Sequence, residues 1–222
     1  MTDRTLIVGA SGGIGSALAA EFSSRGREVT GLSRSVDGLD VTDEASVEHH
    51  LTAQSGPFRT IVVATGVLET PAYTPEKAIA QVTADGLAEQ FRVNAIGPML
   101  VLKHALPLLP ERGRAVIAVL SARVGSIGDN RIGGWHGYRA AKAALNQLMH
   151  GAAVELKRTH PDAILLCLHP GTVETRFTAK YAARHRTVPA AQAAANLADL
   201  IDRAGPEHSG GFYDYAFEGI PW

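Results

Sequence analysis

The chain has one cysteine, no long hydrophobic run and almost no net charge, and each shortage excludes a class of protein. Lone Cys167 cannot form an internal disulfide, and its place in an apolar run predicts a small buried side chain rather than a reactive thiol. No apolar run approaches the roughly 18 residues of a membrane span. The N-terminal sequence has neither the basic region nor the long apolar stretch of a signal peptide. We therefore expect a soluble cytoplasmic protein.

Charge and composition narrow the class further. The 21 basic and 22 acidic side chains leave a formal net charge of −1, which gives no general basis for binding nucleic acid or an acidic membrane. With 45% hydrophobic and 19% charged residues, the 222-residue chain is neither disordered nor fibrous. Its nine histidines show no recurrent metal-ligand spacing, so no metal site is predicted.

Short apolar runs alternate with longer stretches rich in alanine and leucine. The runs predicted as strands are 5–10, 28–33, 60–65, 115–121 and 163–169, with a short late strand at 211–215. The stretches predicted as helices are 13–25, 43–54, 75–109, 137–158 and 189–203. Near-continuous apolar strands are typical of a parallel sheet buried on both faces. The pattern predicts one α/β domain over 1–222, with a doubly wound, mainly parallel sheet and helices on both faces.

One connection in this pattern is unusually short. Only six residues, SRSVDG, separate the strand that ends near Leu32 from the apolar segment 39–41. A helical crossover between parallel strands needs a dozen or more residues. We therefore expect the usual helix to be missing here, and 39–41 to be little more than an extended edge segment.

A glycine-rich loop joins the first predicted strand to the first predicted helix. It runs Val8-Gly9-Ala10-Ser11-Gly12-Gly13-Ile14-Gly15, with the spacing Gly-x-x-x-Gly-x-Gly. Glycines allow a tight turn, and the helix start offers free N–H groups and a positive dipole end to a pyrophosphate. A strand before and a helix after are the context that a dinucleotide loop requires. A plain glycine-rich turn is the alternative.

The end of the second predicted strand indicates which dinucleotide binds. Enzymes that use NAD usually place an acidic residue near this point, on the ribose hydroxyls, but no Asp or Glu stands at 31–35. Ser33, Arg34 and Ser35 stand there instead, and a guanidinium pairs with a 2′-phosphate through two hydrogen bonds. The pattern favours NADP(H), with NAD(H) as the alternative if Arg34 is only a solvated loop cation.

Tyr138 and Lys142 stand four residues apart in a predicted helix, so their side chains share one face. A phenol, with a reference pKa of about 10, is a poor base at pH 7. A nearby ammonium favours the phenolate, so the pair can exchange a proton with an alcohol or carbonyl oxygen. This spacing alone also fits a surface pair, but its combination with the glycine loop favours a catalytic pair.

Together these motifs resemble those of the short-chain dehydrogenase/reductase (SDR) family over nearly the whole chain. The residues that carry the resemblance are Gly9, Gly13, Ile14, Gly15, Tyr138, Ala141 and Lys142. The family implies a Rossmann fold and hydride transfer between a nicotinamide cofactor and a carbonyl or alcohol substrate. The segments 121–147 and 209–222 are similar to the C-factor-like subgroup, which is itself similar to sniffer-type carbonyl reductases.

The resemblance implies further cofactor contacts. Asp40-Val41 is similar to the Asp-Val pair that holds the adenine, and Val63-Ala64-Thr65-Gly66 stands where the family has Asn-Asn-Ala-Gly. The segment 170–175 resembles Pro-Gly-x-Val-x-Thr, which holds the nicotinamide carboxamide. The implied cofactor-binding residues are Gly9, Ser11, Gly12, Gly13, Ile14, Gly15, Ser33, Arg34, Asp40, Val41, Ala64, Thr65, Gly66, Asn94, Tyr138, Lys142, Pro170, Gly171, Thr172, Val173 and Thr175.

The resemblance also implies catalytic roles for three residues. Tyr138 donates a proton to the developing alkoxide, and Lys142 lowers the pKa of Tyr138 and bonds the nicotinamide ribose. Asn94, in FRVNAIGP, fits the helix-embedded asparagine of the family and holds a water that links Lys142 to solvent.

The catalytic serine of the family has no direct counterpart. It stands three residues before a glycine, and anchoring on Gly125 places Ala122 at that position. Ser121 is one residue early, and neighbouring residues of a strand point to opposite faces. Ser126 is four residues late, and its loop has to fold back over the site. We favour Ser121, because it ends the strand, and keep Ser126 as the alternative.

The substrate and the partners are less specified. Phe177 and Tyr181 follow the carboxamide loop, where the family places its substrate lid, and Trp135 and His136 precede Tyr138. Helix packing is the alternative role for Phe177 and Tyr181. The expected partner is a small-molecule carbonyl or alcohol, with neither nucleic acid nor membrane. By resemblance, the helices around 75–109 and 137–158 imply a homodimer or homotetramer.

Three functions compete at this point. The leading one is an NADP(H)-dependent carbonyl reductase or alcohol dehydrogenase. The second is an NADP(H)-binding regulatory or cell-signalling protein with little turnover, which Ala122 and the signalling role of the C-factor favour. The third is another Rossmann-type enzyme, such as a methyltransferase, but that function does not explain Tyr138 and Lys142 on one helix face.

Overall fold

The computed structural model describes residues 3–70, 73–175, 177–178 and 187–222. Within them, one sheet has the strand order β2-β1-β3-β4-β5-β6, and each neighbouring pair is parallel. The strands are β1 (Arg4–Val8), β2 (Glu28–Leu32), β3 (Thr60–Val63), β4 (Ala115–Leu120), β5 (Ala163–His169) and β6 (Phe212–Asp214). Each strand overlaps a run predicted as a strand, so the parallel sheet is confirmed.

The inner strands are nearly continuous in apolar residues because both faces of the sheet are buried. On β4, Ile117 and Val119 pack into the core on one face, whereas Val116 and Ala118 pack into the core on the other. β2 forms one edge of the sheet, and Leu32 is the one fully buried residue of its five. The sheet therefore divides the interior into two apolar cores.

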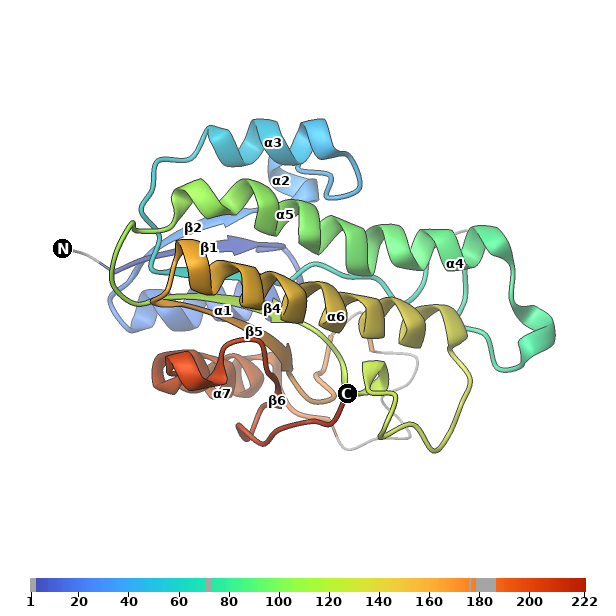
Figure 1. Ribbon diagram of the computed structural model, residues 1–222. Coiled ribbons are helices and arrows are strands. Elements are labelled where there is room, and N and C mark those ends of the chain that lie inside the picture. The colour runs from blue at the N-terminus through green and yellow to red at the C-terminus, as the bar shows by residue number, and fades with distance from the viewer. Residues whose placement is uncertain (1–2, 71–72, 176, 179–186) are drawn as a thin grey trace.

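Helices cover both faces of the sheet (Figure 1). One layer contains α3 (Glu44–Thr52), α5 (Gly97–Ala105) and α6 (His136–Thr159), and the other contains α1 (Gly13–Ser24) and α7 (Ala190–Arg203). Leu51, Leu102 and Leu145 bury the first layer against the sheet, and Leu18 and Leu197 bury the second. This arrangement confirms the predicted doubly wound α/β fold.

The long helix predicted over 75–109 is wrong at its start and is not continuous. α4 (Ala84–Phe91) begins where the Thr83 hydroxyl accepts a hydrogen bond of 3.1 Å from the Gly86 N–H. A π-helical turn, Arg92–Ile96, separates α4 from α5, and a 3₁₀ turn, Leu106–Leu108, follows α5. Before α4 stands a short 3₁₀ turn, Ile79–Gln81. The Thr83 cap fixes the start of the helix, and apolar spacing does not reveal it.

The short connection after β2 contains one turn of helix, α2 (Arg34–Asp37), where the sequence predicted none. The Ser33 hydroxyl caps this turn by accepting a hydrogen bond of 3.3 Å from the Val36 N–H. The segment 39–41 is not a strand. The buried side chains of Leu39 and Val41 hold it against the core. α3 then leads the chain back to β3, which leaves β2 at the edge of the sheet.

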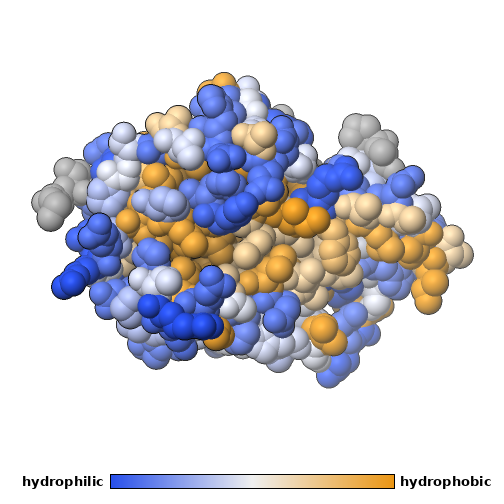
Figure 2. Space-filling model, turned by 45° about the horizontal axis from the view of Figure 1, so that its top comes forward, coloured by the Kyte–Doolittle hydropathy of each residue, from blue (hydrophilic) through white to orange (hydrophobic). Residues whose placement is uncertain are grey.

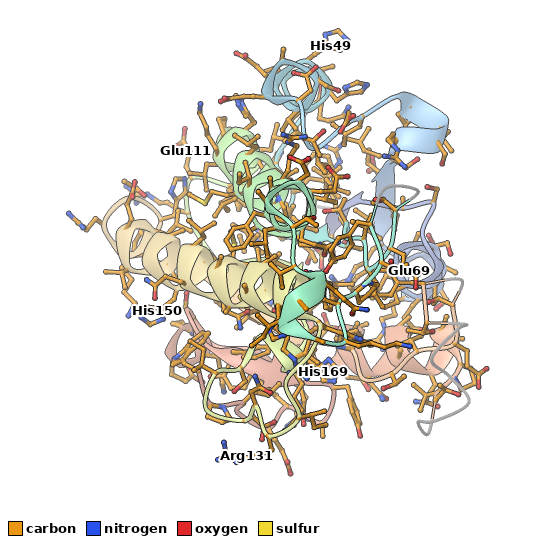
Figure 3. The ribbon with its side chains drawn as sticks, turned by 90° about the vertical axis from the view of Figure 1, so that its right-hand side faces the viewer. His49, Glu69, Glu111, Arg131, His150 and His169 are labelled. Atoms are coloured by element: carbon orange, nitrogen blue, oxygen red, sulfur yellow. The ribbon has the colours of Figure 1, made fainter. Side chains whose placement is uncertain are left out.

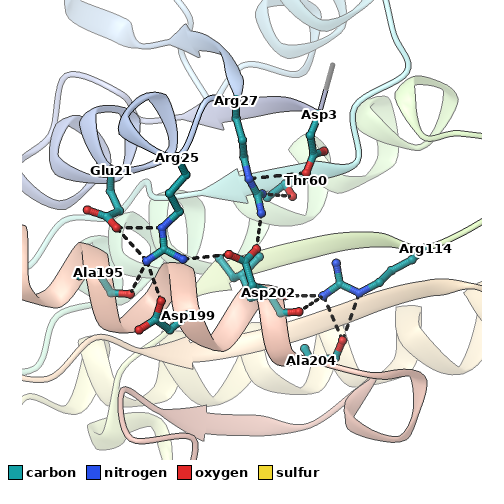
Figure 4. A network of polar contacts seen from close by, with 11 residues as sticks. Asp3, Glu21, Arg25, Arg27, Thr60, Arg114, Ala195, Asp199, Asp202 and Ala204 are labelled. Carbon is teal, nitrogen blue, oxygen red and sulfur yellow. Dashed lines mark hydrogen bonds and ion pairs between the residues drawn. The ribbon is translucent and has the colours of Figure 1, made fainter. Parts of the chain in front are cut away.

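Arginines tie the two helices of the second layer together (Figure 4). Arg25, just after α1, contacts Asp199 at 2.7 Å and Asp202 at 2.8 Å, both on α7. Arg27 pairs with the same Asp202. Arg114, just before β4, donates to carbonyl oxygens at the end of α7, 2.5 and 3.0 Å away. The Arg114 bonds satisfy carbonyl groups that the end of α7 leaves without partners. Together, the three arginines join α7 to the segments that follow α1 and precede β4.

The outer surface of α5 and α6 is apolar. Figure 2, which brings the top of Figure 1 forward, shows apolar side chains gathered over these two helices. The partly buried members of this surface are Met99, Leu100, Leu106, Ala144, Leu148 and Ala152. Val154, on α6, and Ile96, just before α5, have 50% and 48% of their surface exposed. A contiguous exposed apolar surface of this kind marks an interaction site more often than scattered apolar residues do.

Cys167 lies on β5 with 2% of its surface exposed and forms no disulfide. Burial raises the pKa of its thiol to about 12, so the thiol stays neutral, and the predicted inert side chain is confirmed. Among the described helices, none combines the length and the apolar character needed to cross a bilayer.

Candidate active site

The carboxyl ends of the parallel strands meet at one edge of the sheet, and Figure 3 looks onto this edge. Ligands of doubly wound sheets bind at this edge, because the loops that leave the strands converge there. His169, the last residue of β5, and Glu69, in the loop after β3, lie on this side of the molecule (Figure 3). The predicted glycine loop, the 63–66 segment and the 170–175 segment all begin here.

Three glycines of the loop after β1 lie too close to neighbouring atoms to be replaced by residues with side chains. Gly9 has φ = 95°, and a Cβ there would lie 2.9 Å from the carbonyl oxygen of Ala64. A Cβ on Gly15 would lie 2.2 Å from the Gly9 carbonyl oxygen, and one on Gly13 would lie 2.5 Å from Cγ2 of Thr175. The loop therefore touches both other predicted cofactor segments, and the three form one continuous surface.

The start of α1 has the features of an anion site. No side chain caps this helix, and its first turn holds no acidic residue. The first N–H groups of a helix have no partner within it, and here Ser11, Gly12 and Gly13 leave them exposed. In the described residues, the buried Thr65 Oγ1 beside Gly9 has no hydrogen-bond partner. Open donors and an orphaned hydroxyl fit the diphosphate and the ribose of a dinucleotide.

Ser33, Arg34 and Ser35 lie beside the glycine loop at the start of α2. The Ser35 hydroxyl donates to the Ser11 hydroxyl at 2.8 Å, and this bond joins the two predicted segments. The exposed Arg34 side chain makes no hydrogen bond with any other residue that the structure describes. The Ser35 and Ser11 hydroxyls thus lie together beside the loop, and Arg34, the residue predicted to bind a 2′-phosphate, directly precedes Ser35.

An acidic group also reaches the end of β2. The Asp37 carboxylate accepts hydrogen bonds from the backbone N–H of Ser33 at 2.7 Å and from the Ser33 hydroxyl at 3.2 Å. The sequence window 31–35 missed this carboxylate because one helical turn brings residue 37 back over residue 33. The bonds to Ser33 hold the Asp37 carboxylate at the end of β2.

The Asp40-Val41 pair forms a fixed turn next to α5. The Asp40 carboxylate accepts hydrogen bonds from the Thr42 N–H at 2.9 Å and the Thr42 hydroxyl at 2.8 Å, and these bonds lower its pKa. Val41 is buried against Gly97, where a Cβ would lie 2.9 Å from Cγ2 of Val41. The structure brings this pair to the same edge of the sheet as α2.

Asn94 lies in the π-helical turn and is fully buried. Its side-chain oxygen accepts from the Val67 N–H at 3.0 Å, and its nitrogen donates to the Val67 carbonyl at 2.8 Å. The same nitrogen donates to Oε1 of Gln90 at 2.8 Å. Asn94 therefore clamps the loop after β3. Gln90 was missed in the sequence, although its position four residues before Asn94 on a helix is the signal that finds it.

The Asn94 carbonyl has no α-helical partner. Pro98, four residues later, lacks the N–H that would donate to it. Gly66 separates Asn94 from the catalytic candidate on α6, because a Cβ on Gly66 would lie 3.0 Å from Oδ1 of Asn94 and 3.6 Å from Nζ of Lys142. The π-helical turn thus places the Asn94 side-chain oxygen and the Lys142 amine on either side of Gly66.

Tyr138 and Lys142 lie together at the start of α6, as their spacing predicts. Tyr138 is 6% exposed and Lys142 3% exposed, and the Lys142 Nζ lies 5.9 Å from the centroid of the Tyr138 ring. Nζ donates to the Leu120 carbonyl at 2.9 Å. Burial raises the pKa of Tyr138 and lowers that of Lys142 to about 8. In this state of the site the phenol holds its proton at neutral pH, while the amine titrates near physiological pH.

Both candidate serines, Ser121 and Ser126, already donate a hydrogen bond to another group of the protein. Ser121 Oγ donates to Oδ1 of Asn146, on α6, at 2.6 Å. Ser126 Oγ donates to the Pro221 carbonyl and accepts from the Asp129 N–H at 3.0 Å. Ala122, the aligned position, offers only a methyl group. The structure thus gives both hydroxyls protein partners.

The loop after β5 returns along the glycine loop. Gly171 has φ = 83° and packs on the ring of Tyr215, where a Cβ would lie 3.1 Å from Cδ1. Val173 is buried and pairs with Val188, and the Val188 N–H donates to the Thr172 carbonyl at 3.0 Å. This pairing holds 170–175 against the glycine loop, so the predicted carboxamide segment lies at the site.

Aromatic rings flank the Tyr138 phenol. The Trp135 ring lies 6.4 Å from the Tyr138 ring, and the Phe177 ring lies 6.2 Å from it on another segment. Phe177 is 40% exposed and His136, the first residue of α6, is partly buried. Tyr181 lies outside the described residues. Trp135 and Phe177 thus place two aromatic rings beside the phenol.

A sequence profile described as enoyl-(acyl carrier protein) reductase matches residues 9–205. The chain belongs to the short-chain dehydrogenase/reductase family. It is 31% identical over 222 residues to 1-hydroxy-2-glutathionyl-2-methyl-3-butene dehydrogenase of Rhodococcus sp. (strain AD45), covering 93% of this chain and 94% of the relative. It is 34% identical over 146 residues to C-signal of Myxococcus xanthus, covering 65% of this chain and 84% of that protein.

Solved SDR structures have the same fold. The carbonyl reductase Sniffer of D. melanogaster matches with a TM-score of 0.81 at 20% identity, covering 100% of both chains. An SDR from Burkholderia multivorans, solved with bound NADP, matches with a TM-score of 0.80 at 25% identity, also over 100% of both chains. The resemblance that the motifs suggested is confirmed at the level of family and fold.

His169 lies at the same edge of the sheet and was not predicted from the sequence. His169 ends β5 directly before Pro170, and burial, aided by the charge of Arg123, lowers its pKa to about 4. Its Nδ1 has no hydrogen-bond partner among the described residues. The ring is therefore neutral at physiological pH. Across the described residues, no three His, Cys, Asp or Glu side chains gather into a metal-binding group.

Proposed function

We propose that this SDR chain is an NADP(H)-dependent oxidoreductase that interconverts a carbonyl and an alcohol. The observation that carries the proposal is the convergence of Tyr138, Lys142 and Asn94 beside the glycine loop. The Rhodococcus relative is named a dehydrogenase, and the Burkholderia SDR holds NADP, which supports both the reaction type and the cofactor. Any other Rossmann-type enzyme would have no use for a buried phenol and amine on one face of a helix.

The cofactor is held by five segments that meet at the edge of the sheet. The glycine loop and the start of α1 bind the diphosphate, and Ser33, Arg34 and Ser35 bind the 2′-phosphate. Asp40 and Val41 border the adenine, and Thr65, Gly66 and the 170–175 loop border the nicotinamide half. When bound, the nicotinamide supplies or accepts the hydride.

Tyr138 is the proton donor to the carbonyl oxygen in the direction of reduction. Its buried, protonated phenol is the form that this step needs, because burial raises its pKa. The Lys142 ammonium, 5.9 Å from the ring, stabilises the phenolate that forms. The flanking Trp135 and Phe177 rings keep water from competing for the proton.

Asn94 completes the path by which Tyr138 regains the proton that it donates to the substrate. Its carbonyl, which has no α-helical partner because of Pro98, accepts a hydrogen bond from a water that also contacts Lys142. The side chain of Asn94 fixes this geometry through its two bonds to Val67. Ser121 stays the predicted substrate-oxygen contact, for which its hydroxyl has to leave Asn146.

The α5–α6 surface is the proposed subunit contact of a homodimer or homotetramer. It combines contiguous apolar side chains with two long helices that lie side by side (Figures 1 and 2). A second copy of the same surface buries these groups by two-fold symmetry. Such packing fixes α6, the helix that carries Tyr138.

The deciding experiment is titration of the purified protein with NADPH, followed by aldehydes, ketones and quinones with NADPH consumption as the readout. The Tyr138→Phe variant is expected to lose about 100- to 10,000-fold in kcat while its NADPH affinity stays unchanged. Tyr213→Phe, which removes a hydroxyl from β6, is the matched control and keeps full activity.

Each other outcome has a distinct meaning. Full activity in Tyr138→Phe contradicts the assignment of the proton donor. Tight NADPH binding by the native chain without turnover of any carbonyl favours the regulatory function instead, in line with the similarity to C-signal. No binding of NADPH or NADH contradicts the role of the glycine loop.

A further inference from the structure

The helix that carries Tyr138 begins without a cap of its own. Its N-cap residue, Trp135, has φ = 50° and makes no capping hydrogen bond to the helix with its side chain, and the first turn holds no acidic residue. Gly133 and Gly134, directly before it, have φ of 69° and 67°. Glycine adopts this region without strain, but a bulky residue such as Trp135 adopts it only when its surroundings hold it.

A distant acidic residue supplies the missing cap. Oε2 of Glu76 accepts a hydrogen bond of 3.2 Å from the Gly137 N–H, 61 residues later in the chain. The Glu76 carbonyl accepts one of 2.5 Å from the Trp135 N–H. Glu76 is 3% exposed, so its carboxylate meets the positive end of α6 away from water. The two hydrogen bonds thus hold Trp135 and Gly137, the residues on either side of His136.

The surroundings leave room for this carboxylate and for little else. The Tyr73 hydroxyl donates to Oε2 of Glu76 at 2.7 Å. A Cβ on Gly137 would lie 3.0 Å from the Tyr73 hydroxyl and 3.2 Å from Oε1 of Glu76. A Cβ on Gly86, in α4, would lie 2.8 Å from Cδ2 of Tyr73. The Tyr73–Glu76 pair therefore fits between α4 and α6 because both helices have a glycine there.

We propose that Glu76 is a positioning residue for the reaction: it fixes the start of α6 and thereby the place of both Tyr138 and Trp135. The inference rests on the proposed function of Tyr138 as proton donor. Tyr138 follows Gly137 directly, and the ring of Trp135, the other residue that Glu76 holds, lies 6.4 Å from the Tyr138 ring. A displacement of about 1 Å at a reacting group can cost a hundredfold in rate.

Two substitutions at Glu76 separate its hydrogen bond from its charge. Glu76→Ala removes the acceptor for the Gly137 N–H, so kcat is expected to fall by about ten- to a hundredfold. The dissociation constant for NADPH stays within about twofold, because the glycine loop does not contact Glu76. Glu76→Gln keeps an oxygen that accepts the same hydrogen bond, so its kcat is expected to stay within about threefold of the native value.

Two further variants guard against a loss of folding. Thr83→Ala removes the cap of α4, so it lowers the melting temperature and leaves kcat unchanged. If Glu76→Ala does not fold, Gly137→Ala tests the contact from the other side, because its Cβ displaces the carboxylate. It is expected to lower kcat without changing NADPH affinity.

The outcomes distinguish this inference from the proposed function. A native chain that turns over no carbonyl refutes the proposed function. Turnover by the native chain together with native kcat in Glu76→Ala overturns the inference and leaves the function standing. A kcat in Glu76→Gln as low as in Glu76→Ala also overturns it, because the charge and not the hydrogen bond would then be required.

Discussion

At the scale of single residues, the site depends on two groups that burial drives toward neutrality. The buried Tyr138 keeps its proton well above its ordinary pKa, whereas the pKa of Lys142 falls to about 8. The phenol is thus ready to donate in reduction, and the charge that helps it depends on pH. Lys142 is the residue whose protonation state changes in the physiological range.

We expect the rate of carbonyl reduction to fall as pH rises through about 8. The folded-state pKa of Lys142 is lowered from 10.5 to about 8, so its ammonium is present below pH 8 and lost above it. A profile of kcat against pH with saturating NADPH checks this. Lys142→Arg, whose guanidinium stays charged, is expected to lose the falling limb even if its rate is lower. A native limb near pH 10 would contradict the assignment.

Arg34 is expected to select NADPH over NADH. Arg34→Ala removes the guanidinium of the residue next to Ser35, whose hydroxyl contacts the glycine loop at Ser11, so the dissociation constant of NADPH is expected to rise at least about tenfold. The constant for NADH is expected to change little, because NADH lacks the 2′-phosphate. Fluorescence titration with each cofactor measures both. Arg131→Ala, an exposed arginine in the loop before α6, is the matched control. Equal losses for the two cofactors would show that Arg34 does not read the phosphate.

At the scale of elements, capping side chains and prolines determine helix boundaries that apolar spacing does not predict. α4 starts at the Thr83 hydroxyl, and the π-helical turn precedes Pro98, which cannot donate to the Asn94 carbonyl. α6 starts at Glu76, a residue of another segment. Each of these features near the site depends on one side chain that apolar spacing does not reveal.

The contact between α1 and α7 is expected to stabilise the fold measurably. Arg25→Ala removes contacts to Asp199 and Asp202, and the free energy of unfolding is expected to fall by about 1 kcal/mol, less at high salt. The expected loss of stability is modest because the Arg25 side chain is 26% exposed, so water screens its charge. Chemical denaturation at two salt concentrations measures it. The control is Arg92→Ala, which loses a single exposed contact of 3.7 Å to Glu89 and should cost almost nothing. Equal losses in the two variants would refute a special role for the network.

The sequence predicted the elements well and the links between them poorly. Every strand overlaps its predicted run, because a strand buried on both faces is apolar along its length. The glycine loop and the Tyr138–Lys142 pair were found from local spacing. Asp37 and Glu76 were not, because a one-turn helix brings the first back and an irregular segment carries the second. Such residues act across turns or long separations, which no local pattern records.

At the scale of the whole molecule, the two helical layers have different outer surfaces. The layer of α1 and α7 carries ion pairs, and the layer of α5 and α6 carries apolar groups (Figures 2 and 4). Charged groups suit a face that stays in water, and contiguous apolar groups suit one that another chain covers. The asymmetry favours assembly through α5 and α6.

Ala152→Arg is expected to convert the proposed oligomer to a monomer. The residue lies in the middle of the apolar surface of α6, and a charge there stays unpaired when two copies meet. Sedimentation of both proteins across a range of concentrations measures the change. Gln192→Arg, on α7 in the opposite layer, is the control and keeps the native mass. A native chain that is monomeric at every concentration would refute the subunit contact.

The pairing of α1 with α7 also has a consequence for biosynthesis. α1 leaves the ribosome well before α7, but its residues Leu18 and Phe22 share their core with Leu197 and Ile201 of α7. Contacts between segments so far apart in the chain form late. Until α7 emerges, an apolar stripe of the nascent chain stays uncovered, and a chaperone that holds such stripes would find its target there throughout translation.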